Sequence, residues 1–154
     1  MRLVNEFDFA TFRYEVAGTI AMKFDTNVII SAGLKPGGVP ARLVMDWVLR
    51  GNVQPVTSPA VIAEYGEVAM RPKFARYEFP PSWLEHLIDM SLQMPDPPGW
   101  PHPLPDTKDE PFLALAQAAG AWLVTGNMKH FPRPARHGVV VLSPADYLAR
   151  LESR

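Results

Sequence analysis

The sequence contains no cysteine, which excludes disulfide frameworks, thiol nucleophiles and zinc sites built on cysteine. Its 4 histidines include no pair at the close helical spacing of a histidine–zinc motif, so we expect any bound metal to have oxygen ligands. Neither sign of charge dominates, because 15 lysines and arginines stand against 16 aspartates and glutamates. A nucleic-acid partner would therefore have to bind a local basic patch.

Long apolar segments are also missing. The longest, residues 111–124, is interrupted by Gln117 and is shorter than the roughly 20 residues of a membrane span. Acidic residues stand near the N-terminus where a secretory signal has positive charges followed by an apolar core. We therefore expect a cytoplasmic protein.

The chain has 154 residues, enough for one domain with a sizeable core. In residues 1–21 charged and aromatic residues alternate without a sustained period. We interpret this segment as an N-terminal extension, either an upstream in-frame addition or an appendage outside the core. The compact domain is expected over residues 22–152.

Within that domain, apolar segments predict strands and helices in alternation. The expected strands are 20–24, 53–57, 122–125 and 139–142, and the expected helices are 27–34, 39–50, 59–70, 80–93, 109–119 and 144–151. Six prolines between positions 95 and 105 predict an extended surface connector. The alternation predicts a single α/β domain, with a parallel-type central sheet and helices on both faces.

Polar residues follow two of the predicted strands. Residues 25–27 (Asp-Thr-Asn) come directly after the first strand, and residues 125–127 (Thr-Gly-Asn) end the third and follow it. Open parallel sheets bind ligands at the carboxyl ends of their strands. We therefore expect both clusters to face one site.

Two carboxylates on predicted helices add to these clusters. Glu64 lies on or beside the apolar stripe of its helix, and Asp109 precedes Phe112 and Leu113 at helical spacing, so that it faces inward. Converging buried carboxylates raise one another's pKa unless a cation joins them. Oxygen ligands of this kind suit Mg²⁺ or Mn²⁺.

Each of these residues also has a purely structural interpretation. Asp25 can be a turn residue that bonds to its own backbone, and Asp109 can be a helix N-cap. Glu64 can pair with a lysine or arginine at the rim of the core, and Asn127 can belong to a tight turn. The combination of these four residues, more than any one of them, favours a metal-binding site.

Four segments, in order along the chain, resemble the motifs of PIN-domain proteins. They are residues 22–32, 58–65 with 71–74, 109–116 with 118–121, and 123–127. The sequence Lys-His-Phe-Pro at 129–132 also resembles the branch of toxin components of toxin–antitoxin systems. The resemblance covers about Met22 to Leu151.

The resemblance implies a divalent-metal-dependent endoribonuclease of the VapC-like type, with Mg²⁺ or Mn²⁺ held by Asp25, Glu64 and Asp109. The fourth acidic position of many PIN domains aligns with Asn127, which can coordinate or orient water but adds no charge. Whether one or two metals bind is therefore left open. A metal in such a site lowers the pKa of a water and polarises the scissile phosphate.

Several neighbouring residues complete the expected site. Asn27 and Thr125 are expected to position a site acid or water, and Asp106 or Glu110 can replace Asp109 as the third acid. Candidates for binding RNA phosphates lie within nine residues: Lys129, His130, Arg133, Arg136 and His137. A solvated basic loop is an equally open interpretation of that cluster. Weaker candidates are Lys35, Arg71 and Lys73.

Two functions follow from the sequence. In the first, the protein is the ribonuclease toxin of a toxin–antitoxin pair, neutralised by a small antitoxin and homodimeric as the resemblance implies. In the second, it is a PIN-like RNA-binding or protein-interaction module with weak or no nuclease activity, because Asn127 replaces an acid. A phosphatase with an aspartyl-phosphate intermediate is disfavoured, because Asn27 stands where a second acid is needed.

Overall fold

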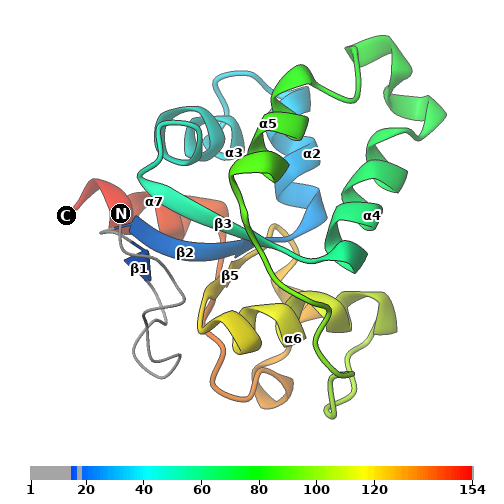
Figure 1. Cartoon of the computed structure of the whole chain (residues 1–154), viewed down its shortest axis with the longest axis vertical. Helices are drawn as coiled ribbons and strands as arrows, with labels where there is room; N and C mark the ends of the chain where they lie inside the picture. The colour runs from blue at the N-terminus through cyan, green and yellow to red at the C-terminus, as the bar shows by residue number, and fades with distance from the viewer. Residues whose placement is uncertain (1–14, 17–18, 154) are drawn as a thin grey trace.

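The central sheet has five parallel strands in the order β4-β3-β2-β5-β6 (Figure 1). In chain order they are β2 (Thr19–Phe24), β3 (Val53–Thr57), β4 (Leu92–Gln93), β5 (Trp122–Val124) and β6 (Val141–Leu142). A two-residue strand, β1 (Glu15–Val16), pairs antiparallel with β2. These elements come from a computed structural model that describes residues 15–16 and 19–153.

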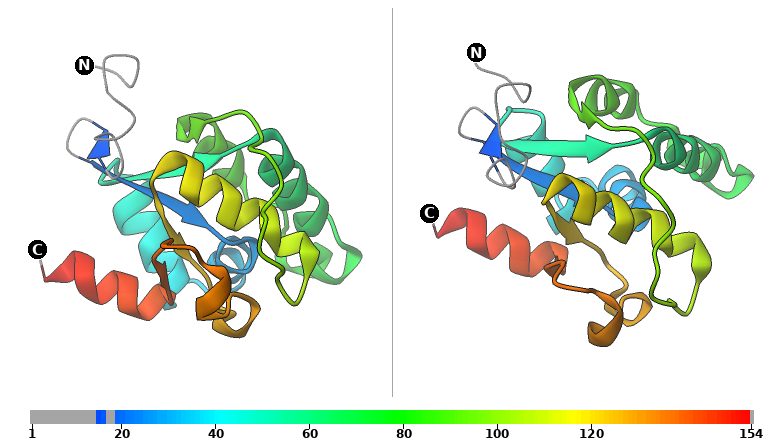
Figure 2. Two further views of the ribbon diagram at one scale, coloured as in Figure 1. Left: turned by 90° about the horizontal axis from the view of Figure 1, so that it is seen from below. Right: turned by 60° about the horizontal axis from the view of Figure 1, so that its bottom comes forward.

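Helices cover both faces of the sheet. The α-helices are α2 (Thr26–Leu34), α3 (Val39–Arg42), α4 (Pro59–Ala69), α5 (Ser82–Met90), α6 (Glu110–Ala119) and α7 (Pro144–Glu152). Shorter helical segments are η2 (Leu43–Val48), η3 (Pro72–Tyr77), η4 (Thr107–Asp109), η5 (Met128–His130) and η6 (Arg133–Ala135). Helices α2, α3 and α5 lie on one face, whereas α6 crosses the other over β2 (Figures 1 and 2). The prediction of a single α/β domain with a parallel sheet between helices is therefore confirmed.

The strand order creates a switch point between β2 and β5. From β2 the chain moves outward to β3 and β4, and then returns to the other side of β2 to form β5 and β6. The connections after β2 and β5 therefore leave in different directions, which opens a crevice at their carboxyl ends. Pairing of Phe24 with Val124 brings Asp25 beside Thr125, and the Asp25 N–H donates to the Val124 carbonyl at 2.9 Å.

Helix α6 is central because apolar side chains cover most of its circumference. Phe112, Leu113 and Leu115 are all buried, as the nearly continuous apolar sequence predicted. Gly120 ends the helix in a left-handed conformation with φ of 63°, which glycine adopts without steric cost. Pro111 in the first helical turn loses no hydrogen bond, because the first N–H groups of a helix have no partner within it.

Three predicted elements differ from the structure by more than one residue at an end. The helix expected over 80–93 ends at Met90, because Ser91 bonds the Ile88 carbonyl and the next two residues pair with β3 as strand β4. The helix expected over 39–50 is a short α-helix followed by the π-helical η2, and ends at Val48. Only two residues of the strand expected over 139–142 pair with β5.

The start of β2 bears on the expected extension. Ile20 and Ala21 pair with Val53 and Gln54 of β3, so the sheet includes backbone from before residue 22. Residues 1–14 lie outside the described part of the chain, and the domain boundary at residue 22 stays a prediction. No helix of the described residues is long and apolar enough to cross a membrane.

Candidate functional site

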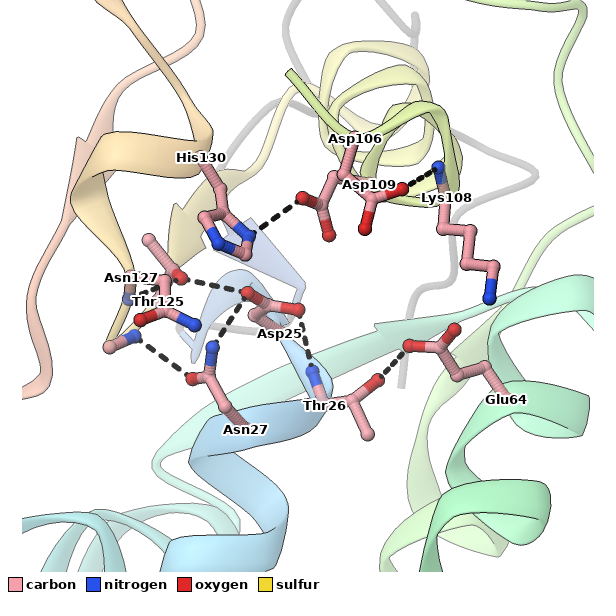
Figure 3. A network of polar contacts seen from close by, with 11 residues as sticks. Asp25, Thr26, Asn27, Glu64, Asp106, Lys108, Asp109, Thr125, Asn127 and His130 are labelled. Carbon is pink, nitrogen blue, oxygen red and sulfur yellow. Dashed lines mark hydrogen bonds and ion pairs between the residues drawn. The ribbon is translucent and has the colours of Figure 1, made fainter. Parts of the chain in front are cut away.

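Asp25 lies at the carboxyl end of β2 and is only 4% exposed. One carboxylate oxygen accepts the Thr26 backbone N–H at 2.8 Å, since Asp25 caps the N-terminus of α2. The other accepts the Asn27 amide at 3.0 Å and the Thr125 hydroxyl at 2.7 Å (Figure 3). Three donors thus offset the cost of burying this carboxylate.

Asn27 joins the ends of the two central strands. Its Nδ2 donates to Asp25, while its Oδ1 accepts the Gly126 backbone N–H at 2.9 Å. The Thr125 hydroxyl in turn accepts the Asn127 N–H at 3.0 Å. The two polar clusters recognised in the sequence, 100 positions apart, therefore form one hydrogen-bonded network.

The other two candidate acids face this network from helices. Glu64 on α4 accepts the Thr26 hydroxyl at 2.6 Å. Asp109, at the junction of η4 and α6, lies 2.9 Å from Nδ1 of His130 and has a side chain 13% exposed. Asp25, Glu64 and Asp109 all line one open pocket of about 360 Å³.

The pocket raises the proton affinity of Asp109. Burial raises the pKa of Asp109 to about 6, the charge of Asp25 adds to this rise, and His130 opposes it. The charges of Asp25 and Asp109 therefore interact, although the two residues come from distant parts of the chain. A cation between them would favour the ionised form of both.

The donor chemistry suits a hard divalent cation. Among the described residues, no group of three Asp, Glu, His or Cys side chains is close enough to hold a metal ion as they stand. A bound ion would have to draw the carboxylates together, in competition with Thr26 at Glu64 and with His130 at Asp109. All three are oxygen donors from separate segments that share one pocket, which fits Mg²⁺ or Mn²⁺.

The remaining predicted residues occupy different places. Asn127 is exposed and lines the pocket, as does Asp106, which caps η4 through the Lys108 N–H. Glu110, the other alternative for the third acid, lines a separate hollow beside Trp100.

The predicted phosphate-binding residues are spread around the pocket. His130 lines it, whereas Lys129 and Arg133 are exposed and lie outside its lining. Arg136 donates to the Phe131 carbonyl at 2.6 Å, and His137 stacks on His102. Three cations line the pocket from other elements: Arg71, Lys73 and Lys108. Lys35 is exposed and outside the pocket.

Sequence reasoning missed a lysine buried beneath the pocket. Lys23 is 0% exposed, and its Nζ donates to the Phe24 carbonyl and, at 2.8 Å, to the Tyr65 hydroxyl. Burial lowers the pKa of Lys23 to about 7, although the charges of Asp25 and Glu64 act to raise it. A single charged residue inside the apolar segment 20–24 was the signal in the sequence.

Comparisons with known proteins agree with this fold. The PIN domain family model matches residues 22–129. A chain of the VapBC2 complex from Rickettsia felis, bound to a DNA fragment from its promoter, is 19% identical with a TM-score of 0.55. A chain of FitAcB from Neisseria gonorrhoeae is 20% identical with a TM-score of 0.52. Each similarity covers 80% of this chain and 98% of the other.

A sequence relative matches over a shorter stretch. The uncharacterized protein MJ1680 from Methanocaldococcus jannaschii is 34% identical over 58 residues, which are 38% of this chain and 37% of that protein. The match thus spans little more than a third of the relative's length. The family model, in contrast, covers well over half of this chain and includes every candidate acid. The chain therefore belongs to the PIN domain family.

Proposed function

We propose that the protein is a divalent-metal-dependent endoribonuclease that acts as the toxin of a toxin–antitoxin pair. The observation that carries the proposal is the convergence of Asp25, Glu64 and Asp109 on one pocket at the switch point of the sheet. These carboxylates would hold Mg²⁺ or Mn²⁺. When bound, the ion would polarise the scissile phosphate and make a water molecule more acidic.

The chain's own residues prepare the pocket for this reaction. Thr125 and Asn27 fix the orientation of the Asp25 carboxylate through their hydrogen bonds. Asn127 adds an amide that can orient water or substrate without adding charge to the pocket. His130 holds Asp109 until a cation competes for that carboxylate.

An RNA backbone would meet positive charges from more than one element. Arg71 and Lys73 line the pocket beside α4, and the side chain of Lys108 extends toward Glu64 (Figure 3). Lys129 and Arg133 follow β5 and are free to contact a strand that continues beyond the pocket. Contacts of this kind bind the phosphates and position the strand without reading its sequence.

The toxin role rests on similarity. The sequence motifs resemble VapC-like toxins, and the fold resembles chains of VapBC2 and FitAcB. By the same resemblance we propose a cognate antitoxin, a homodimer and a cytoplasmic location. Masking of the pocket by the antitoxin would then control the nuclease.

A mixed RNA pool provides the test. We expect the purified protein to cut RNA with Mg²⁺ or Mn²⁺ but not with EDTA, and we expect Asp25→Asn to abolish cutting. Asp89→Asn, on the exposed surface of α5, is the matched control and should cut at the rate of the wild type. If the folded wild type cuts with neither metal, the nuclease proposal fails.

The second candidate function is an RNA-binding or interaction module of the same fold. The observation that favours it is Asn127, a neutral side chain in the pocket where many PIN domains have an acid. In that case the wild type would bind RNA in the same assay without cutting it. Binding that is equal in EDTA and in Mg²⁺, without product, would select this function.

A further inference from the structure

Lys23 occupies an unusual position beneath the candidate site. Its ammonium group donates to the Phe24 carbonyl and to the Tyr65 hydroxyl, and the same hydroxyl donates to that carbonyl. The ring centroid of Phe112 lies 4.2 Å from Nζ, and that of Tyr65 lies 4.8 Å from it. A carbonyl, a phenol and two aromatic faces therefore surround a fully buried cation.

These neighbours belong to the three segments that carry the candidate acids. The Phe24 carbonyl is part of the peptide bond that leads into Asp25. Tyr65 follows Glu64 on α4, and Phe112 lies in the first turn of α6, three residues after Asp109. Lys23 thus lies where all three acid-bearing segments meet.

Within the described part of the chain, no carboxylate is in direct contact with the ammonium. Among the described residues, the partners of its hydrogen bonds are neutral, and none of the ion pairs there includes Lys23. Burying a charge without an ionised partner is costly, and an apolar residue of similar size would often be more stable there. The compensation comes from a longer range, since Asp25 and Glu64 both act to raise the pKa of Lys23.

We propose that Lys23 is the resident counter-charge of the pocket and limits the pocket to one divalent cation. The inference rests on the proposed function, because it takes Asp25, Glu64 and Asp109 as the acids. Their three negative charges and the ammonium of Lys23 leave two negative charges, which one divalent ion neutralises. Asn127 adds none, and four further charged residues of the lining are exposed, so that solvent screens their charges: Arg71, Lys73, Asp106 and Lys108.

The charge of Lys23 has a measurable consequence for the metal. An ammonium beneath the pocket repels a divalent ion, and this repulsion is stronger in a buried environment than in water. Its removal should therefore strengthen metal binding. If the role of Lys23 were purely structural, its replacement would change the thermal stability of the protein and leave its affinity for the metal unchanged.

Calorimetric titration of the full chain with Mn²⁺ at pH 6.5 tests the inference. We expect one ion per wild-type chain, and a dissociation constant at least about tenfold lower for Lys23→Met. Lys35→Met, which removes an exposed lysine outside the pocket, should bind within about threefold of the wild type.

A second neutral variant keeps the test valid if Lys23→Met does not fold. Lys23→Gln is equally uncharged but keeps an amide N–H for the Phe24 carbonyl or Tyr65, and it should also bind Mn²⁺ more tightly. Melting curves in EDTA identify which variants are folded. Two ions on the wild type, or an unchanged or weaker affinity in the folded neutral variants, would overturn the inference alone. No Mn²⁺ binding by the wild type would contradict the proposed function as well.

Discussion

The two halves of the pocket are built differently. The half at the ends of β2 and β5 is a closed network, in which Asp25 receives three hydrogen bonds and Asn27 joins the two strand ends. The half formed by α4 and η4 is looser, because Glu64 has a hydrogen bond to Thr26 and Asp109 pairs with a half-exposed His130. One half therefore holds its carboxylate in place before any ligand arrives, and the other can adjust.

This difference suggests that the two halves have different roles in binding a cation. A fixed carboxylate defines where a cation binds, since its donors leave it little freedom to turn. The carboxylates of the looser half can then rotate toward the ion and complete its coordination. The following changes test whether the two halves differ in this way.

The largest expected effect comes from matched threonine substitutions. Thr125→Val removes a donor from the buried Asp25 and an acceptor from the Asn127 N–H, and should cost about 2 kcal/mol of unfolding free energy. Thr26→Val removes only the hydroxyl bond to Glu64 and should cost about 1 kcal/mol. Urea unfolding in EDTA measures both. Equal costs would contradict the distinction between the halves.

Asp109 predicts a pH dependence in the looser half. Its pKa is raised from 3.8 in the unfolded chain to about 6, so its ionisation opposes folding. The contribution of Asp109 to stability is therefore fully present below pH 3.8 and is lost as the pH rises through 6.

Asp109→Asn removes this dependence. In EDTA we expect the variant to gain stability relative to the wild type as the pH increases from 4 to 7, because only the wild type has an acid to ionise. Unfolding of both proteins across this range measures the difference. A constant difference between them would contradict the raised pKa.

Exposed lysines should have smaller effects, and of Lys35 and Lys73 only the pocket-lining Lys73 should affect RNA binding. Lys73→Ala, which removes a pocket-lining cation, should raise KM for RNA about threefold with little change in kcat. The effect should fade at high salt, since exposed charges are screened. Lys35→Ala, on an exposed loop outside the pocket, is the matched control. A fall in kcat without a change in KM would contradict a role in substrate binding.

The smallest effect is expected at the N-terminus. If residues 1–21 are an extension, a chain that starts at Met22 should melt at the temperature of the full chain. Pairing of Ile20 and Ala21 with β3 makes this a sharp test, and a chain that starts at Thr19 keeps β2 whole as a control. A melting temperature lowered only in the shorter chain would move the domain boundary to residue 19.

The sequence was most informative where local chemistry decides the structure. Asp25 and Thr125 directly follow two parallel strands, so their position at one edge of the sheet could be predicted from the strand pattern. The helix expected from residue 59 begins there because Ser58 caps α4, and the helix expected to end at residue 119 does so because Gly120 ends α6. At these positions a cap or a turn requires one kind of residue.

Features that depend on packing between distant segments could not be predicted in this way. Strand β4 exists because its two residues pair with β3, although they continue a helical pattern. The pair of His130 with Asp109 and the burial of Lys23 also depend on how α4, α6 and the loop after β5 come together. No local pattern specifies such contacts.

The central claim is that carboxylates from both halves form one catalytic metal site. The most direct test measures Mn²⁺ binding and RNA cleavage side by side for Asp25→Asn, Glu64→Gln and Asp109→Asn. We predict that each variant binds Mn²⁺ more weakly and cuts RNA at least about 100-fold more slowly than the wild type. A folded variant that retains both metal affinity and cleavage would exclude its carboxylate from the site and contradict the account.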